Sequence, residues 1–296
     1  VLLLLAGAAW YFVAVLVITR RWQYLLLAVK RVPMSRLYPL VCIGYMGNNV
    51  YPFRSGEALR IYLLKRNEDV PIVRGTTTVL VERVFDGLVM LTFIVVPLLF
   101  IDNTSDEMRQ IASFTAPLFL TALVVFFVLA TQPNLLRRLV HLFSQILPGK
   151  ISEIVVSLSE EVIHGLEGLR TPAHLAGTVV TSYLTWAIEA SVYWIVAFAF
   201  DMDASYALML VVVGTVNLAG LIPASPGQIG VFEFFASAVL VGAGFAESLA
   251  LSYAVTVHLV IWLPVTLAGF GFLARQGLGW QAITQAHKLD EEMSSP

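Results

Sequence analysis

Charge is scarce in this sequence. Only 13% of the 296 residues are charged, whereas soluble domains usually carry about 25%. Hydrophobic residues make up 58% of the chain, and the mean hydropathy is +0.81. No soluble core could bury that much apolar surface, so an ordinary soluble domain is excluded. The net charge of -2 argues against nucleic acid as a partner.

Cysteine and the common catalytic motifs are also scarce. Cys42 is the single cysteine, which excludes an internal disulfide and a cysteine-built metal site. The sequence contains no Walker motif, no dinucleotide-binding fingerprint and no zinc-binding His-Glu helix. We therefore expect no cofactor, no metal and no catalytic residue. An intramembrane protease could use Ser225 with His258, but this serine lies between prolines and lacks a supporting glycine two residues before it.

Long apolar runs are what the sequence has in abundance. A spanning helix needs roughly 20 residues to cross about 30 Å of hydrocarbon, so a chain of this length allows on the order of seven or eight crossings. Because the chain opens at Val1 without a methionine, we expect it to begin inside a longer protein, with a preceding segment missing. The apolar runs predict helices over residues 1–18, 38–50, 76–100, 112–131, 174–200, 206–222, 230–244 and 249–274.

Basic residues predict the orientation. They gather after the first apolar run, between the second and third, in the segment 134–170 and near the C-terminus, whereas Asp102–Glu107 and Asp201–Asp203 separate these clusters. The positive-inside rule places the basic clusters in the cytoplasm, and we expect a prokaryotic cytoplasmic membrane. From Ile151 onward, apolar residues at helical spacing predict a cytoplasmic amphipathic helix within 134–170. The expected domains are a transmembrane domain over 1–275 and a cytoplasmic C-terminal tail over 276–296.

Two breaks rich in proline and glycine interrupt the apolar helices. The first is Tyr51–Glu57, where the chain must turn back to the side from which it entered, so we predict a re-entrant hairpin. The second is Asn217–Gly230, which repeats the order asparagine, proline, glycine and then glutamate at Glu233. Irregular backbone at membrane depth survives only where protein or a water-filled cavity satisfies its polar groups. The expected fold is therefore an all-α polytopic helical bundle with two re-entrant or broken helices, which allows an inverted internal repeat.

Several ionisable residues lie inside the predicted helices. An ionised side chain at the centre of a spanning helix costs roughly 2.5 to 3.5 kcal/mol on insertion scales, so each needs a partner or water. Glu82, Arg83 and Asp86 start the helix over 76–100, and Glu189 lies in the middle of 174–200. Internal salt bridges that pin the bundle are one interpretation of these charges. A hydrated, charged cavity is the other.

The breaks supply further candidate binding groups. Arg54 and Arg60 could hold a lipid phosphate, because a guanidinium group matches phosphate oxygens bidentately. Glu57 and Glu233 could balance that charge or contact a cationic headgroup, and Ser225 either borders the site or caps a helix. The candidate substrate-binding residues are Asn48, Asn49, Arg54, Glu57, Arg60, Glu82, Arg83, Asp86, Ser225, Gly227 and Glu233.

Three motifs, in this order, resemble those of a known family. Gly47–Arg60 resembles the family's first signature, Val81–Asp86 resembles its Glu-Arg-x-x-Asp pattern, and Pro223–Glu233 is similar to its Ser-Pro-Gly-Gly-hydrophobic-Gly-x-x-Glu signature. Together they indicate the lysylphosphatidylglycerol synthase transmembrane family, which includes the flippase domain of the multiple peptide resistance factor. Gln228 stands where the family has its second glycine, which puts the tightness of that turn in question. The resemblance implies lipid handling; we expect no lysine transfer, since no aminoacyl-transferase domain follows residue 275.

We therefore predict a non-enzymatic flippase that moves a phospholipid or polyprenyl-phosphate-linked lipid across the cytoplasmic membrane. Two alternatives stay open. One is an intramembrane enzyme or accessory membrane domain acting on a lipid-linked substrate, with Glu57, Glu82 or Asp86 as acid or base. The other is a scaffold that recruits a soluble enzyme through the segment 134–170. A homo-oligomer also stays open.

Overall fold

The computed structural model describes residues 1–27, 29–51, 55–98, 121, 132–145, 148–166, 171–220 and 225–276. Within these ranges the regular structure is helical and contains no strand, which confirms the predicted all-α class. The described elements are α1 (Leu2–Leu26), α2 (Met34–Val50), α3 (Gly56–Glu68), α4 (Ile72–Leu98), α6 (Pro133–Ser144), α7 (Gly149–Leu166), α8 (Pro172–Ala199), α9 (Tyr206–Ala219), the 3-10 turn η3 (Pro226–Gln228), α10 (Val231–Gly242) and α11 (Glu247–Arg275). The predicted run 112–131, Arg109 and the tail beyond Gln276 lie outside the described residues.

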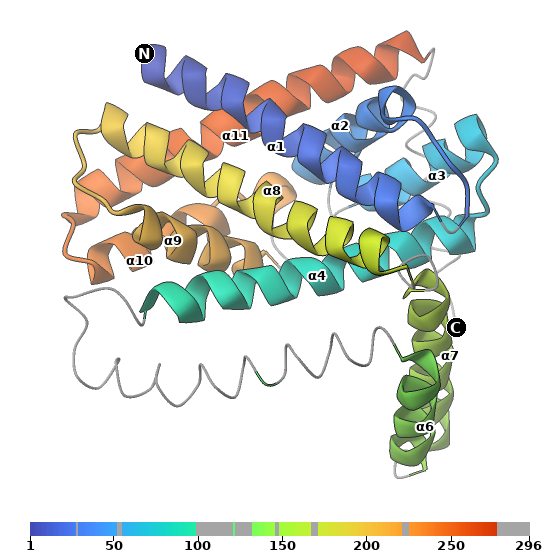
Figure 1. Ribbon diagram of the computed structural model, residues 1–296. Coiled ribbons are helices and arrows are strands. Elements are labelled where there is room, and N and C mark those ends of the chain that lie inside the picture. Colours follow the sequence, from blue (N-terminus) through green and yellow to red (C-terminus); the bar gives the residue numbers. More distant parts are fainter. Residues whose placement is uncertain are drawn as a thin grey trace.

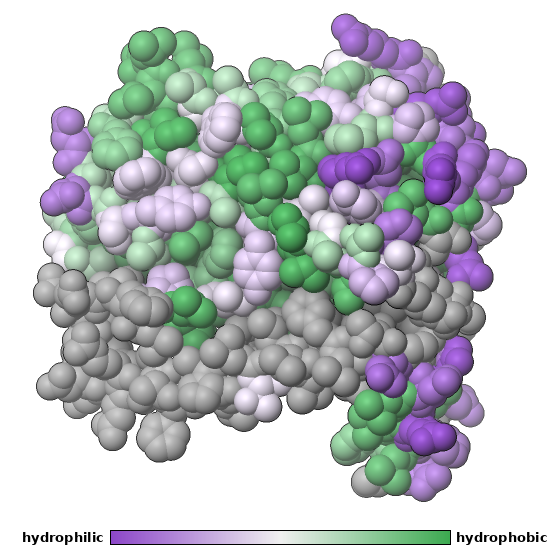
Figure 2. Space-filling model, viewed as in Figure 1, coloured by the Kyte–Doolittle hydropathy of each residue, from purple (hydrophilic) through white to green (hydrophobic). Residues whose placement is uncertain are grey.

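Three described helices are long and apolar enough to cross a membrane, namely α1, α8 and α11. α1 packs along α8, α2 packs along α11, and α4 packs along α9 (Figure 1). Large apolar side chains such as Val180, Leu259 and Leu267 are more than half exposed, as lipid contact requires. Hydrophilic residues gather toward the end where α3 lies and along α6 and α7 (Figure 2). This distribution supports an integral membrane protein.

The first break joins α2 and α3 into an antiparallel hairpin. Gly44 and Gly47 of α2 face Gly56 of α3, and a Cβ atom added at Gly56 would overlap the carbonyl oxygen of Gly44. α2 has 17 residues, about 26 Å at 1.5 Å per residue, which is shorter than the hydrocarbon core. A glycine-packed hairpin of this length fits the re-entrant architecture that the sequence predicts.

The second break joins α9 and α10 into another hairpin. These helices have 14 and 12 residues, about 21 and 18 Å long, so each is too short to cross the bilayer alone. Between them, Gly227, Gln228 and Gly230 have φ angles of 66°, 59° and 91°, in the left-handed region that favours glycine. Gln228 therefore has the backbone conformation that a glycine would adopt. The tight turn is formed even though glutamine replaces the second glycine of the family signature.

The segment 134–170 differs from the single amphipathic helix that the sequence predicts. It contains two helices, α6 and α7, which pack against each other and project from the bundle beside α4 (Figure 1). Arg137 of α6 pairs with Glu160 of α7, with Nη2 2.9 Å from Oε2. Pro148 and Gly149 lie at the junction, where proline removes a backbone donor and glycine adds freedom. These two residues explain why one helix becomes two.

α1 also differs from the sequence prediction, because it continues to Leu26 instead of ending near residue 18. Arg21 lies within this extension and its side chain is only 1% exposed. The sequence analysis placed it in a cytoplasmic basic cluster. A buried arginine is tolerated in an apolar helix only with anionic partners, and α4 provides them.

Candidate functional site

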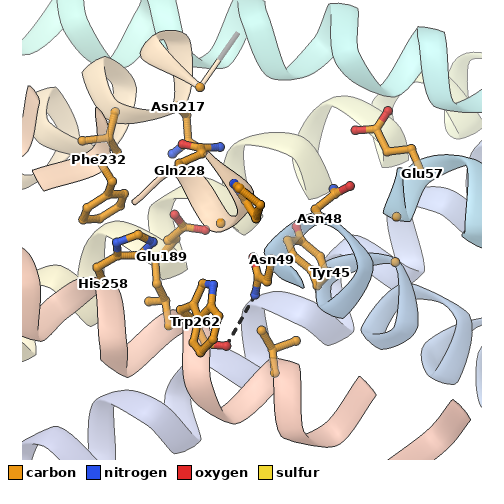
Figure 3. A pocket seen from close by; sticks show the side chains of 18 of the residues that line it. Tyr45, Asn48, Asn49, Glu57, Glu189, Asn217, Gln228, Phe232, His258 and Trp262 are labelled. Carbon is orange, nitrogen blue, oxygen red and sulfur yellow. Dashed lines mark hydrogen bonds between the residues drawn. The ribbon is translucent and has the colours of Figure 1, made fainter. Parts of the chain in front are cut away.

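A cavity of about 540 Å³ lies between the two breaks. This volume falls in the range of small-molecule binding sites. Figure 3 shows Asn48, Asn49 and Glu57 on one side of the cavity and Asn217, Gln228 and Phe232 on the other. The two interrupted hairpins, far apart in the sequence, therefore face the same interior space.

The tips of the two hairpins are joined through α11. Nδ2 of Asn49 donates to Oγ1 of Thr266 at 2.8 Å and to the carbonyl oxygen of Trp262 at 3.4 Å (Figure 3). Gly227 of the second break lies against the Asn49 carbonyl and the Trp262 indole, and a Cβ added there would come within 3.0 Å of that carbonyl oxygen. Glycine at 227 thus permits the close approach as well as the left-handed turn. The structure brings the two breaks together, as the sequence predicts.

Arginines and carboxylates form a buried cluster at the first break. Arg21 lies 2.5 Å from Asp86 and 3.2 Å from Glu82, measured from guanidinium nitrogen to carboxylate oxygen. Arg60 lies 3.3 Å from Glu82, and its guanidinium carbon is 4.4 Å from the centre of the Trp22 ring. Glu82 is 1% exposed, so these pairs are formed away from bulk water. Glu82 and Asp86 therefore form internal salt bridges, as the first interpretation of these charges predicts.

Arg83 connects this cluster to the open cavity. Its guanidinium group lies 2.7 Å from Glu82, 3.3 Å from Asp86 and 3.6 Å from Glu57. Its side chain is 31% exposed, in contrast to the buried Arg21. Nε of Arg60 is buried and has no hydrogen-bond partner among the described residues. The cavity therefore presents the partly exposed guanidinium group of Arg83 to a ligand, whereas Nε of Arg60 is buried.

Eight of the eleven sequence-predicted residues line the cavity. Asp86 lies behind the lining, where it accepts hydrogen bonds from Arg21 and from Nε1 of Trp186 at 2.7 Å. Glu233 also lies behind it, bound to His258, which does line the cavity. Arg54 is outside the described residues. The eight lining residues are Asn48, Asn49, Glu57, Arg60, Glu82, Arg83, Ser225 and Gly227.

The hydrogen bonds at the second break decide two interpretations of Ser225. Its hydroxyl donates to the carbonyl oxygen of Ile229 at 2.6 Å and does not cap a helix, so the capping interpretation is wrong. Glu233 performs that task instead, accepting from the Gly230 amide at 2.6 Å. Nδ1 of His258 lies 2.6 Å from the Glu233 carboxylate. Ser225 and His258 thus have other partners, and no hydrogen bond between them occurs in the described structure.

The sequence analysis missed the aromatic and amide wall of the cavity. Trp186 and Tyr193 of α8 line it together with Glu189, which the sequence analysis named as a charge inside a helix and not as a binding residue. Their spacing of three and four residues puts all three on one face of the helix. That spacing was visible in the sequence, although nothing there showed which face points inward. Tyr11, Tyr45 and Trp262 complete the aromatic part of the wall, with Asn217 and Gln228 beside them.

No group of three or more metal-ligating side chains occurs among the described residues. The fold and the cavity define a class: a helical membrane protein in which two broken hairpins enclose a polar site. The chain belongs to the family described as the lysylphosphatidylglycerol synthase TM region, which matches residues 1–269. This confirms the family resemblance found in the sequence.

Curated relatives come from archaea. A UPF0104 membrane protein of Methanothermobacter thermautotrophicus is 26% identical over 265 residues, covering 84% of this chain and 76% of its own length. The glycosyltransferase AglD of Haloferax volcanii is 24% identical over 260 residues. That match covers 78% of this chain but only 42% of AglD. No solved structure is significantly similar to the chain.

Proposed function

We propose that this protein is a lipid translocase, and that the cavity between the two breaks receives a phosphate-bearing headgroup. The observation that carries the proposal is the meeting of both broken hairpins at one cavity that also exposes Arg83. Broken helices facing a central polar site are the architecture by which many transporters hold a polar substrate at membrane depth. Phospholipids and polyprenyl-phosphate lipids share the phosphate that such a site would hold.

The arrangement of arginines supports an anionic group. Arg60 and Arg83 line the cavity, and a guanidinium group can give two parallel hydrogen bonds to phosphate oxygens. Glu82 pairs with Arg60 and Glu57 pairs with Arg83, which holds both arginines at the cavity wall. A phosphate entering the site would share the guanidinium donors with these carboxylates. Exchange of partners within a charge cluster lets the headgroup enter and leave without a dry, unpaired ion.

Membrane vesicles with labelled phosphatidylglycerol test this function. The protein is reconstituted, and a membrane-impermeant quencher reports how fast label moves from the inner to the outer leaflet. Loss of a charge-assisted hydrogen bond worth about 1.5 to 3 kcal/mol should slow translocation by Arg83→Gln roughly 10- to 140-fold relative to wild type. Arg36→Gln is the matched control, because Arg36 pairs with Glu68 outside the cavity and is 65% exposed. We expect it to translocate within about twofold of wild type.

Two results would count against the translocase. Wild-type protein that moves label no faster than empty vesicles removes the function itself. Equal slowing by Arg83→Gln and Arg36→Gln shows that any lost arginine impairs the protein, and the cavity then has no special part in transport.

A second candidate function is an accessory membrane domain that holds a lipid-linked substrate for an enzyme. It is favoured by the similarity to AglD, which is named a glycosyltransferase. Glu82 and Asp86 are bound by arginines, which suits holding charge better than acid or base catalysis. The vesicle assay separates the two functions, since vesicles contain no transferase. Lipid binding without translocation would favour the accessory role.

A further inference from the structure

Glu189 is a buried carboxylate for which the proposed phosphate site has no use. It lies near the middle of α8, is 4% exposed and lines the cavity. In the described part of the chain no arginine, lysine or histidine is within ion-pair distance of it. Every other cavity carboxylate named above has a cationic partner. An ionisable side chain at membrane depth is a functional candidate by default, because its burial is costly unless it acts.

The groups that face Glu189 come from every surrounding element. α8 itself contributes Tyr193, α9 contributes Asn217, and α4 contributes Asp86. None of these neighbours is a cation, so Glu189 has no opposite charge beside it, and Asn217 and Tyr193 can offer its carboxylate only hydrogen bonds. The remaining titratable groups are Tyr11 of α1, Tyr45 of α2, and His258 and Tyr253 of α11.

His258 does not serve as the missing cation. Its Nδ1 is bound to Glu233, and its ring stacks on Phe232 with the ring centres 4.1 Å apart. Figure 3 shows Glu189 and His258 on the same side of the cavity. A protonated His258 would be neutralised by Glu233 at 2.6 Å. His258 therefore faces Glu233 and offers Glu189 no separate positive charge.

The charges around the cavity leave Glu189 as the carboxylate without a balancing cation. Among the described residues, Arg21, Arg60 and Arg83 balance Glu57, Glu82 and Asp86. An ionised Glu189 is therefore a surplus negative charge among the described residues of this site. A phosphate entering next to it would add a second one, and like charges repel strongly where the dielectric is low.

We propose that Glu189 takes up a proton when a lipid phosphate enters the cavity and gives it up when the phosphate leaves. The inference rests on the proposed function. The proton comes from a buffer acid or hydronium ion in the cavity water, and it forms an O–H bond on the Glu189 carboxylate. Because binding of an anion and binding of a proton then favour each other, the two are carried together. A transmembrane proton gradient can in this way drive net lipid movement.

Calorimetry measures the proton directly. The full chain in detergent is titrated with dihexanoyl phosphatidylglycerol in two buffers of different ionisation enthalpy, PIPES and imidazole, at the same pH. The difference between the binding enthalpies gives the number of protons taken from the buffer. Wild type should take up about one proton per lipid when Glu189 starts ionised. Glu189→Gln, which has the shape of the protonated carboxyl group, should bind the lipid with no proton uptake.

Two further variants make the result specific. Glu247→Gln changes an exposed carboxylate at the start of α11, and it should keep the wild-type uptake. His258→Gln tests the only other titratable pair described at this end of the cavity. If uptake disappears in His258→Gln and remains in Glu189→Gln, the proton belongs to the histidine pair and our assignment is overturned.

The outcomes separate this inference from the proposed function. Binding without proton uptake in wild type throughout a series of increasingly alkaline pH values, in which Glu189 becomes ionised before the lipid binds, overturns the role of Glu189 and leaves the phosphate site standing. Failure of wild type to bind the lipid at all overturns both. The wild-type measurement alone decides between these outcomes, even if Glu189→Gln does not fold.

Discussion

The two ends of the cavity are built on different physical principles. At the first break, the described charges are matched: three arginines meet three carboxylates, and α2 and α3 touch through glycines. At the second break, amides and aromatic rings predominate, and the turn depends on left-handed backbone. Charge at the first end suits a headgroup phosphate. The surplus carboxylate of Glu189 near the second end suits a mobile proton.

The difference also concerns rigidity. The pairs at the first end are 1% to about a third exposed, so losing one partner leaves another charge in a dry environment. The second end holds its shape with the hydrogen bond that Asn49 donates to α11 and with the Glu233 carboxylate, which accepts from the Gly230 amide and contacts Nδ1 of His258. We therefore expect substitutions to have larger effects on stability at the first end.

Arg21 gives the largest expected effect. Arg21→Met leaves Glu82 and Asp86 without their most buried partner, and breaking a buried pair costs about 3 to 5 kcal/mol. The neighbouring Arg20 is exposed and, among the described residues, forms hydrogen bonds with Gln23 and Tyr24 of its own helix, so Arg20→Met is the matched control. Thermal unfolding in detergent should show a large loss of stability for Arg21→Met and a change below about 1 kcal/mol for Arg20→Met. Similar losses in both variants would contradict the buried cluster as the main support of the first end.

Gly56 gives the next effect and tests the hairpin itself. A Cβ at this position would overlap the Gly44 carbonyl and approach Asn48, and overpacking typically costs about 1 to 3 kcal/mol. Gly87 of α4 has nothing within 4 Å of an added Cβ, so Gly87→Ala should be neutral or stabilising by about 0.5 to 1 kcal/mol. The free energy of unfolding of both variants distinguishes a steric effect from a general intolerance of alanine. A stable Gly56→Ala protein would mean that α2 and α3 can separate.

Much of this comparison could be predicted from the sequence. Pro and Gly at Tyr51–Glu57 and Asn217–Gly230 mark the breaks, and the rule that broken backbone needs an interior site predicts that they meet. Glu82, Arg83 and Asp86 were visible because charge is rare in apolar segments. In each of these cases the residue types within a short stretch of sequence were enough for the prediction.

Arg21 could not be recognised in the same way. The positive-inside rule counts basic residues near the ends of apolar runs, and it cannot tell a solvated arginine from a paired one. The partner of Arg21 is Asp86, which is 65 residues away in the sequence and becomes a neighbour only when α1 packs beside α4. Glu189 poses the same difficulty, because its isolation depends on which side chains five other helices turn toward it.

Gln228 gives the smallest expected effect and tests how the second end keeps its shape. Its φ of 59° is unfavourable for any residue with a Cβ, and its side chain packs against Gly220. Gln228→Ala loses that contact and keeps the backbone penalty, whereas Gln228→Gly loses both. Because left-handed backbone costs a residue with a Cβ about 1 kcal/mol or more, the glycine variant should be the more stable of the two by about that amount in chemical or thermal unfolding. Equal stabilities would show that the turn relaxes when the side chain is shortened, so that the Gln228–Gly220 contact, and not the backbone, sets the geometry of the second break.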